Sequence, residues 1–152
     1  MDKEKSIDVL NTLIVINNDR IEGYQTASEE TEEGDLKDLF HSLIRTSQKN
    51  KAELIVEMHK LGGTPDEGTK TTGKIYRAWM DLKALVTGNE RVSILNSCEY
   101  GEGVAIDTYV DALDDNGEDL TAEQHMMLQA QCTALKADRE TVIGLRNMMS
   151  AA

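Results

Sequence analysis

Apolar residues recur every three to four positions through most of the chain, and this spacing limits the fold more than any other feature of the sequence. It is the spacing of an α-helix that turns one face toward a core. One helix is predicted over residues 6–28 and a second over residues 35–61. The single proline and the 4% aromatic content argue against a β-sandwich or barrel, which needs frequent turn residues. The sequence therefore predicts an all-α protein.

Capping residues mark the ends of the predicted helices. Asp35 is predicted as the N-cap of the second helix, and one glycine of the pair Gly62-Gly63 suits the left-handed position that ends it. A short helix is predicted over residues 75–86, closed by Gly88. Asn89 is then predicted to cap the helix that follows.

Two more long helices complete the pattern. One spans residues 92–113, and the other begins after Thr121, where Gln124 completes a capping box. The connection over residues 62–88 is far longer than the other turns, so it can run the length of the molecule and make the helices it joins parallel. We therefore predict one domain over residues 1–152: a ferritin-like four-helix bundle with a long crossover that carries a short extra helix.

The charge balance excludes several classes of function. The chain has 28 acidic and 16 basic residues, and its net charge of −12 argues against non-specific binding to nucleic acid. No apolar run approaches the roughly 20 residues that span a bilayer. The N-terminus is charged, and two cysteines do not make a disulfide framework. The sequence predicts a cytoplasmic protein without nucleic-acid or membrane partners.

Several polar side chains fall on the inner faces of the predicted helices. Placing each residue at 100° to the last shows that these side chains face inward. Counting residues from the turns near residues 31 and 118 then puts them at about the same level along the bundle. Burying an unpaired carboxylate is costly, so this layer needs partners, water, protons or a cation. It consists of Asn17, Ser47, Glu99, Glu102, Gln131 and Asp138.

Two interpretations of the layer stay open. It is either a hydrated hydrogen-bond network that fixes the register of the helices, or a site for a divalent cation such as iron, manganese or zinc. Both predict that Glu99 and Glu102 are at least half buried. The network predicts that one of these carboxyls has a raised pKa and that replacing both by Gln is neutral or stabilising.

The usual signature of a di-metal site is missing from the sequence. Such a site takes a Glu-x-x-His pair from each of two helices. His41, His59 and His125 have no Glu at that spacing and are predicted to lie at the surface. Cys98 is predicted to be a buried structural thiol. These absences favour a protein that is not an enzyme.

Several short motifs resemble those of one family. They are Asn18-Asp19-x-x-Glu22-Gly23-Tyr24, Ala52-Glu53-Leu54, Leu61-Gly62-Gly63-x-Pro65, Tyr76-Arg77-x-Trp79-x-x-Leu82-Lys83, Ile94-Leu95, Cys98-Glu99-x-Gly101-Glu102 and Leu145-Arg146. The chain is similar to the uncharacterised bacterial ferritin-like four-helix-bundle proteins, classed as a domain of unknown function. The resemblance implies the ferritin-like topology. Within the ferritin-like class it also implies metal ligands at Glu22, Glu53, Glu99 and Glu102, with Arg139 near the place of a ligand histidine.

Two functions are therefore carried forward. The first is a non-catalytic, stress-associated or interaction bundle in which the polar layer is structural. The second is a metal-carboxylate protein with weak oxidase or storage chemistry, whose predicted ligands are Glu99, Glu102, Asp138, Gln131 and Glu22. Methionines near the ends of the last helix, together with the crossover helix, offer further apolar surface, so a homodimer is predicted.

Overall fold

The computed structural model describes residues 2–69, 73–88 and 90–150, and within these ranges the chain is helical and has no β-strand. The prediction of an all-α protein is confirmed. The helices are α1 (Lys3–Glu30), α2 (Gly34–Lys60), α3 (Gly73–Gly88), α4 (Arg91–Asp115) and α5 (Ala122–Ser150), with a short 3-10 helix at Gly117–Asp119.

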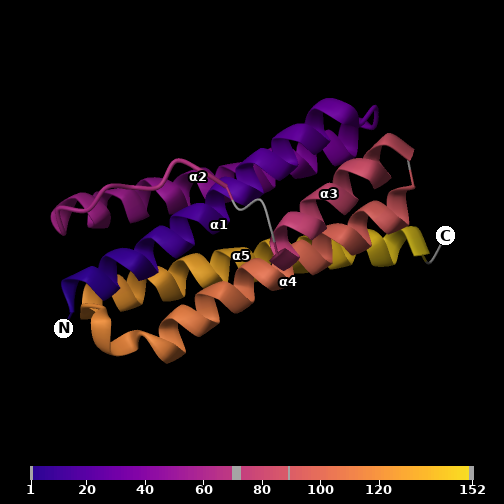
Figure 1. Cartoon of the computed structure of the whole chain (residues 1–152). Helices are drawn as coiled ribbons and strands as arrows, with labels where there is room; N and C mark the ends of the chain where they lie inside the picture. The colour runs from indigo at the N-terminus through magenta and orange to yellow at the C-terminus, as the bar shows by residue number, and fades with distance from the viewer. Residues whose placement is uncertain (1, 70–72, 89, 151–152) are drawn as a thin grey trace.

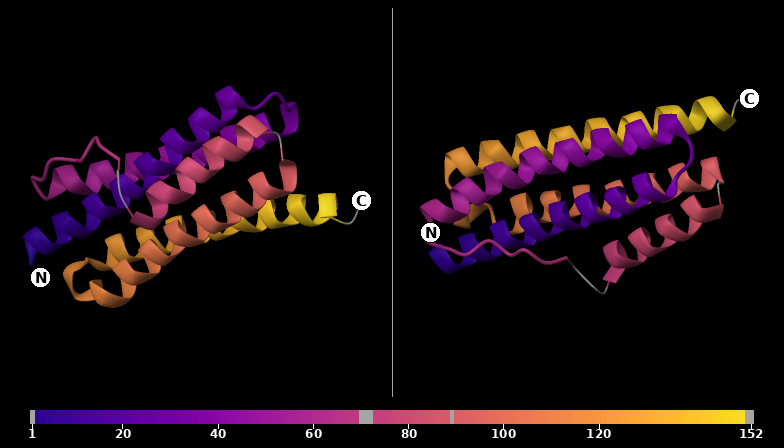
Figure 2. Two further views of the ribbon diagram at one scale, coloured as in Figure 1. Left: turned by 45° about the vertical axis from the view of Figure 1, so that its right-hand side comes forward. Right: turned by 90° about the horizontal axis from the view of Figure 1, so that it is seen from above.

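Four long helices lie side by side, and the shorter α3 packs against α1 and α4 (Figure 1). α1 and α2 form one antiparallel pair, and α4 and α5 form another. An extended segment runs back along α1 before α3 begins, so α2 and α4 point in the same direction in every view (Figure 2). This is the direction that the long connection predicts.

Two of the predicted helix ends have the expected geometry. Gly62 has a φ of 74°, and the amides of Gly62 and Gly63 donate to the carbonyls of His59 and Met58 at 3.0 and 3.1 Å. These two bonds are those of a Schellman motif, which satisfies the last carbonyls of α2. At the start of α5, Thr121 and Gln124 each donate a backbone N–H to the other's side chain at 3.0 Å.

The prediction that Asp35 caps α2 is wrong. The N-cap is Glu33, and Asp35 lies in the first turn, where its carboxylate accepts hydrogen bonds from the Arg91 guanidinium at the start of α4. The Asp35 carboxylate, which was predicted to cap its own helix, thus forms an ion pair with a residue that is distant in the sequence. Asn89 lies outside the described residues, and the N-cap of α4 is Glu90.

Trp79 on α3 fits against α1 because residue 23 has no side chain. A Cβ at Gly23 would lie 2.5 Å from the indole ring, closer than atoms can approach. The ring meets Tyr24 edge-on, with centroids 4.8 Å apart, and it contacts both clusters of core side chains. α3 is therefore part of the packed core.

Side-chain amides on α1 hold the extended segment in place. Asn11 donates to the Thr64 carbonyl at 3.3 Å and accepts from the Asp66 amide at 2.9 Å. Asn18, seven residues further along the same helix face, donates to the carbonyls of Asp66 and Gly68 at 3.1 and 2.9 Å. The segment thus has a defined path along α1.

Candidate functional site

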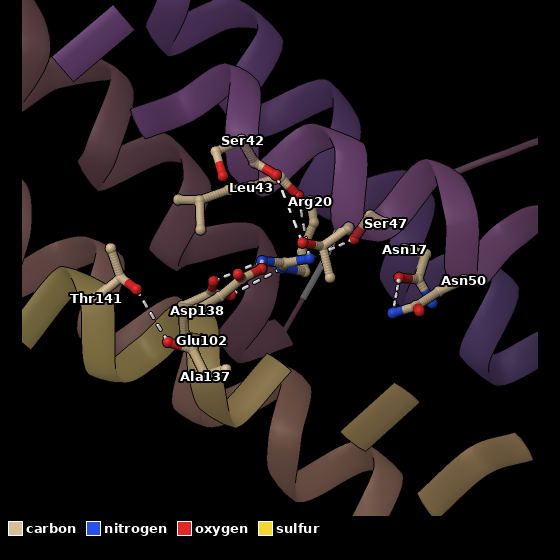
Figure 3. A network of polar contacts seen from close by, with 11 residues as sticks. Asn17, Arg20, Ser42, Leu43, Ser47, Asn50, Glu102, Ala137, Asp138 and Thr141 are labelled. Carbon is tan, nitrogen blue, oxygen red and sulfur yellow. Dashed lines mark hydrogen bonds and ion pairs between the residues drawn. The ribbon is translucent and has the colours of Figure 1, made fainter. Parts of the chain in front are cut away.

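Arg20 is a fully buried arginine at the centre of the molecule (Figure 3). It comes from α1, and its Nε and Nη2 donate to the two carboxylate oxygens of Glu102 on α4, at 2.7 and 2.5 Å. Glu102 is also 0% exposed. Nη2 donates in addition to Asp138 on α5, at 3.1 Å. One guanidinium therefore connects three helices by charge-assisted hydrogen bonds, which are among the stronger kind.

The remaining donors of Arg20 bind the fourth long helix. Nη1 donates to the Ser47 hydroxyl at 2.5 Å and to the Leu43 carbonyl at 3.4 Å, both on α2. A guanidinium has five N–H groups. In this site all five have an acceptor, so Arg20 has no donor left for another molecule.

Burial and the ion pair act in opposite senses on both partners. Burial lowers the pKa of Arg20, but the attraction and hydrogen bonds of Glu102, with smaller contributions from Tyr24 and Asp138, raise that pKa above its ordinary value overall. Burial raises the pKa of the Glu102 carboxyl, and Arg20 opposes that rise. The prediction that one inner carboxyl has a raised pKa is confirmed for Glu102, with burial as the main cause and Asp138 as a minor one.

Tyr24 lies beside this ion pair. The Arg20 guanidinium carbon is 5.6 Å from the centre of the Tyr24 ring, within the range of a cation–π contact. Burial, followed by the charge of Glu102, raises the pKa of the Tyr24 hydroxyl well above its ordinary value. Burial also raises the pKa of the neighbouring Cys98 thiol, which is 0% exposed. The prediction of a buried thiol at Cys98 is confirmed.

A second buried network lies further along the same four helices. Asn17 on α1 donates to the Tyr109 hydroxyl on α4 at 2.8 Å, and that hydroxyl donates to Gln131 on α5 at 2.7 Å. Gln131 in turn donates to the Asn50 carbonyl on α2 at 3.2 Å and to the Glu53 carboxylate at 3.1 Å. Burial raises the pKa of the Tyr109 hydroxyl.

Glu99 belongs to neither network. Its side chain is 22% exposed, and its carboxylate pairs with Arg139 at 3.3 Å and with Arg146, both on α5. The predicted single layer thus divides into three groups. Arg20 is surrounded by Glu102, Asp138 and Ser47. Tyr109 is bound by Asn17 and Gln131. Glu99 lies apart from both, at the partly exposed edge of the core, which we call the rim. The expectation that Glu99 and Glu102 are at least half buried is confirmed.

A family comparison covers most of this arrangement. The sequence profile of a domain of unknown function, DUF2383, matches residues 5–115, which is more than half of the chain. The chain belongs to the DUF2383 family. The match spans α1 to α4 and so includes Arg20, Ser47 and Glu102, whereas Gln131 and Asp138 on α5 lie outside it. A search of functionally characterised proteins finds no match to the chain.

The predicted metal ligands of this DUF2383 protein lie in different places. Glu22 is exposed on α1 beside a cavity of about 230 Å³ between α1 and α3, and Glu99 is held by two arginines. Glu102 and Asp138 share Arg20, while Gln131 binds Tyr109. In the part of the chain that the structure describes, no group of three or more His, Cys, Asp or Glu side chains is arranged to hold a metal ion. Metal binding stays a prediction for titration to test.

Sequence reasoning missed Arg20, although the signal was present. Arg20 lies three residues after Asn17 and four before Tyr24, so it falls on the inner stripe of α1. Tyr109 also falls on the inner face of α4, seven residues after Glu102, and its hydroxyl is the centre of the second network. A test for cations among the inner residues of the DUF2383 sequence would have found the partner that Glu102 requires.

Proposed function

We propose that this DUF2383 chain is a non-catalytic interaction protein of ferritin-like topology, in which the buried polar groups fix the register of four helices. The observation that carries the proposal is the saturation of Arg20, whose five N–H groups all have acceptors on α2, α4 and α5. A buried guanidinium whose five N–H groups all have acceptors has no donor left for a substrate. A buried pair of this kind is suited to selecting one arrangement of helices.

The ferritin-like part of the proposal is supported by the direction of the helices. α2 and α4 are parallel, and the connection between them runs back along α1 and contains α3 (Figure 2). This topology distinguishes ferritin-like folds from simple up-down bundles. The resemblance of the sequence to bacterial ferritin-like proteins supports the same topology and a cytoplasmic, stress-associated role.

Thermal melts with and without metal test the proposal. We expect the melting temperature of the wild type to be unchanged by saturating Mn(II), Fe(II) or Zn(II), because a cation at Glu102 would have to displace Arg20. A ligand that binds only the folded state raises its stability by mass action. A rise in melting temperature that the Asp138→Asn variant abolishes would establish the alternative, a metal-carboxylate protein, and overturn this proposal.

We also propose that the protein is a homodimer. Three methionines offer exposed apolar surface: Met126 near the start of α5, Met148 near its end and Met80 on α3 are 69%, 72% and 49% exposed. A second copy of the chain would cover such exposed apolar side chains. Light scattering at high protein concentration tests this, and the mass of a monomer would contradict it. None of the helices that the structure describes has an apolar stretch of the length and hydropathy that crosses a membrane.

A further inference from the structure

The outward face of α4 combines a groove with an unusual run of charge. No Lys or Arg occurs between Arg91 and Lys136, a stretch with nine Asp and Glu residues. Tyr100, Asp107, Asp111 and Asp114 are exposed and follow one another at spacings of seven, four and three residues, which places them on one face of the helix. This face spans roughly four turns.

A groove of about 600 Å³ runs along this face. Its wall includes Tyr100, which is 53% exposed, the partly buried Val104, and the two aspartates Asp107 and Asp111. Gly103 forms a notch in it, because the nearest atom to a Cβ at that position is the Arg139 Nε, 4.0 Å away. Arg139 from α5 also lines the groove, and its guanidinium is paired with Glu99 at 3.3 Å. The groove therefore offers apolar contact at Tyr100 and negative charge at Asp107 and Asp111, and Asp114 continues that charge one turn beyond its lining.

The aspartates weaken the helix that carries them. Like charges three or four residues apart repel, and negative charge near the carboxyl end of a helix opposes the helix dipole. Within the described residues, Asp107, Asp111 and Asp114 make no ion pair that would offset this repulsion. Repulsion that lowers the stability of the protein, with no contact inside the molecule to offset it, is typical of a surface that binds a partner.

We propose that the face of α4 from Tyr100 to Asp114 binds a basic amphipathic helix of a partner protein. Lysine or arginine side chains one turn apart meet Asp107, Asp111 and Asp114, and an apolar side chain enters the notch at Gly103 beside Tyr100. Charge complementarity sets this choice of partner, and recognition of an amphipathic helix in a groove is a recurring mode of peptide binding. The inference rests on the proposed interaction function and names the chemistry of its partner.

The probe is a synthetic helix of Lys, Leu and Ala with lysines at positions i, i+4 and i+7, labelled for fluorescence anisotropy. The test variant is Asp107→Asn, Asp111→Asn, Asp114→Asn. The matched control is Glu30→Gln, Glu32→Gln, Asp38→Asn, which removes the same charge from exposed residues at the α1–α2 turn. We expect the test variant to bind about tenfold more weakly and the control to stay within about twofold of wild type.

Two further readouts keep the result specific. The test variant should melt above the wild type, because repulsion along α4 is relieved, so weaker binding is not a sign of unfolding. Tyr100→Ser should weaken binding without any change in charge. Equal losses in the test and control variants, or no binding of the peptide to the wild type, would overturn the inference. Neither outcome depends on metal, so the melts described above judge the proposed function separately.

Discussion

Two glutamates on α4, three residues apart, each pair with arginine in different surroundings. Glu102 and its partner Arg20 are both 0% exposed, and the pair is bidentate. The side chain of Glu99 is 22% exposed, and those of its partners Arg139 and Arg146 are 38% and 23% exposed. The chemistry of the two sites is the same. What differs is the water available to each charge if its partner is removed.

This difference predicts very different energies for the two sites. A charge at the surface regains water when it loses its partner, so exposed pairs contribute little. A buried charge has no such substitute, and removing one partner leaves the other desolvated. Glycines show a steric form of the same contrast between surface and interior. A side chain added to a glycine at the surface finds room, whereas one added in the interior does not. The predictions below test the contrast in both ways.

Glu102→Gln should have the largest effect. It leaves Arg20 buried with Asp138 as its remaining charged partner, and we expect a loss of about 3–5 kcal/mol in the free energy of unfolding. Urea denaturation followed by circular dichroism measures it. The hydrogen-bond network was expected from the sequence to make replacement of both Glu99 and Glu102 by Gln neutral or stabilising, but that expectation did not include Arg20. A loss below about 1 kcal/mol would mean that water reaches the guanidinium.

The triple variant Arg20→Met, Glu102→Leu, Asp138→Asn is the control for that result. It removes the guanidinium and both of its carboxylate partners and leaves side chains of similar volume, so its stability should be closer to wild type than that of Glu102→Gln. If the triple variant is less stable than Glu102→Gln, the buried charges stabilise the fold beyond the avoidance of an unpaired charge.

Gly23→Ala should have the second largest effect. Its Cβ would lie 2.5 Å from the Trp79 ring, so the indole or α3 must move, at an expected cost of about 1–3 kcal/mol. Trp79 is the single tryptophan, so its fluorescence reports the shift directly. Gly103→Ala is the matched control at the rim, where a Cβ meets nothing within 4.0 Å except the Arg139 Nε. That change should stabilise the protein by about 0.5–1 kcal/mol, since Ala favours helix over Gly.

Glu99→Gln should have a small effect. Its partners are partly exposed and can be solvated, so we expect a loss of about 0.2–1 kcal/mol that shrinks as salt is added. Denaturation at low and high ionic strength measures it beside Glu102→Gln. A loss equal to that of Glu102→Gln would show that the two sites are not distinguished by burial.

Asp35 should give the smallest effect, visible only in acid. The hydrogen bond from Arg91 lowers the pKa of this carboxyl below its ordinary value, so the ionised form is favoured in the folded state. Its contribution is therefore complete above the ordinary carboxyl pKa of about 3.9 and is lost as pH falls through the lower folded value. The stability difference between wild type and Asp35→Asn should vanish over that range. A constant difference would assign the effect to packing.

The helices and some of their ends follow from local physics. Apolar spacing located all five helices, and Gly62, Thr121 and Gln124 marked ends that hydrogen bonds to near neighbours in the chain determine. Asp35 was misassigned because its partner, Arg91, is 56 residues away. Where the competing contact is distant in the chain, a cap residue cannot be assigned from its neighbours alone.

The candidate site was predicted only in part. Placing residues at 100° per step correctly brought Glu102 inside, along with Asn17, Ser47 and Gln131, because the direction of a side chain depends on the helix alone. The same construction grouped Glu99 with Glu102. The two side chains point about 60° apart around the helix, and this difference places Glu99 at the rim and Glu102 in the core. The partners of each carboxylate depend on how the helices pack, which a single helix does not contain.

The sequence by itself determined that the chain is helical, that α2 and α4 are joined by a long connection, and that polar groups lie inside. Those properties arise from spacing and capping over a few residues. Only the tertiary structure decided that Arg20 from α1 is the partner of Glu102 and Asp138, 82 and 118 residues away. A buried charge is stable only with its partner in place, and that partner is supplied by the packing of four helices around one guanidinium.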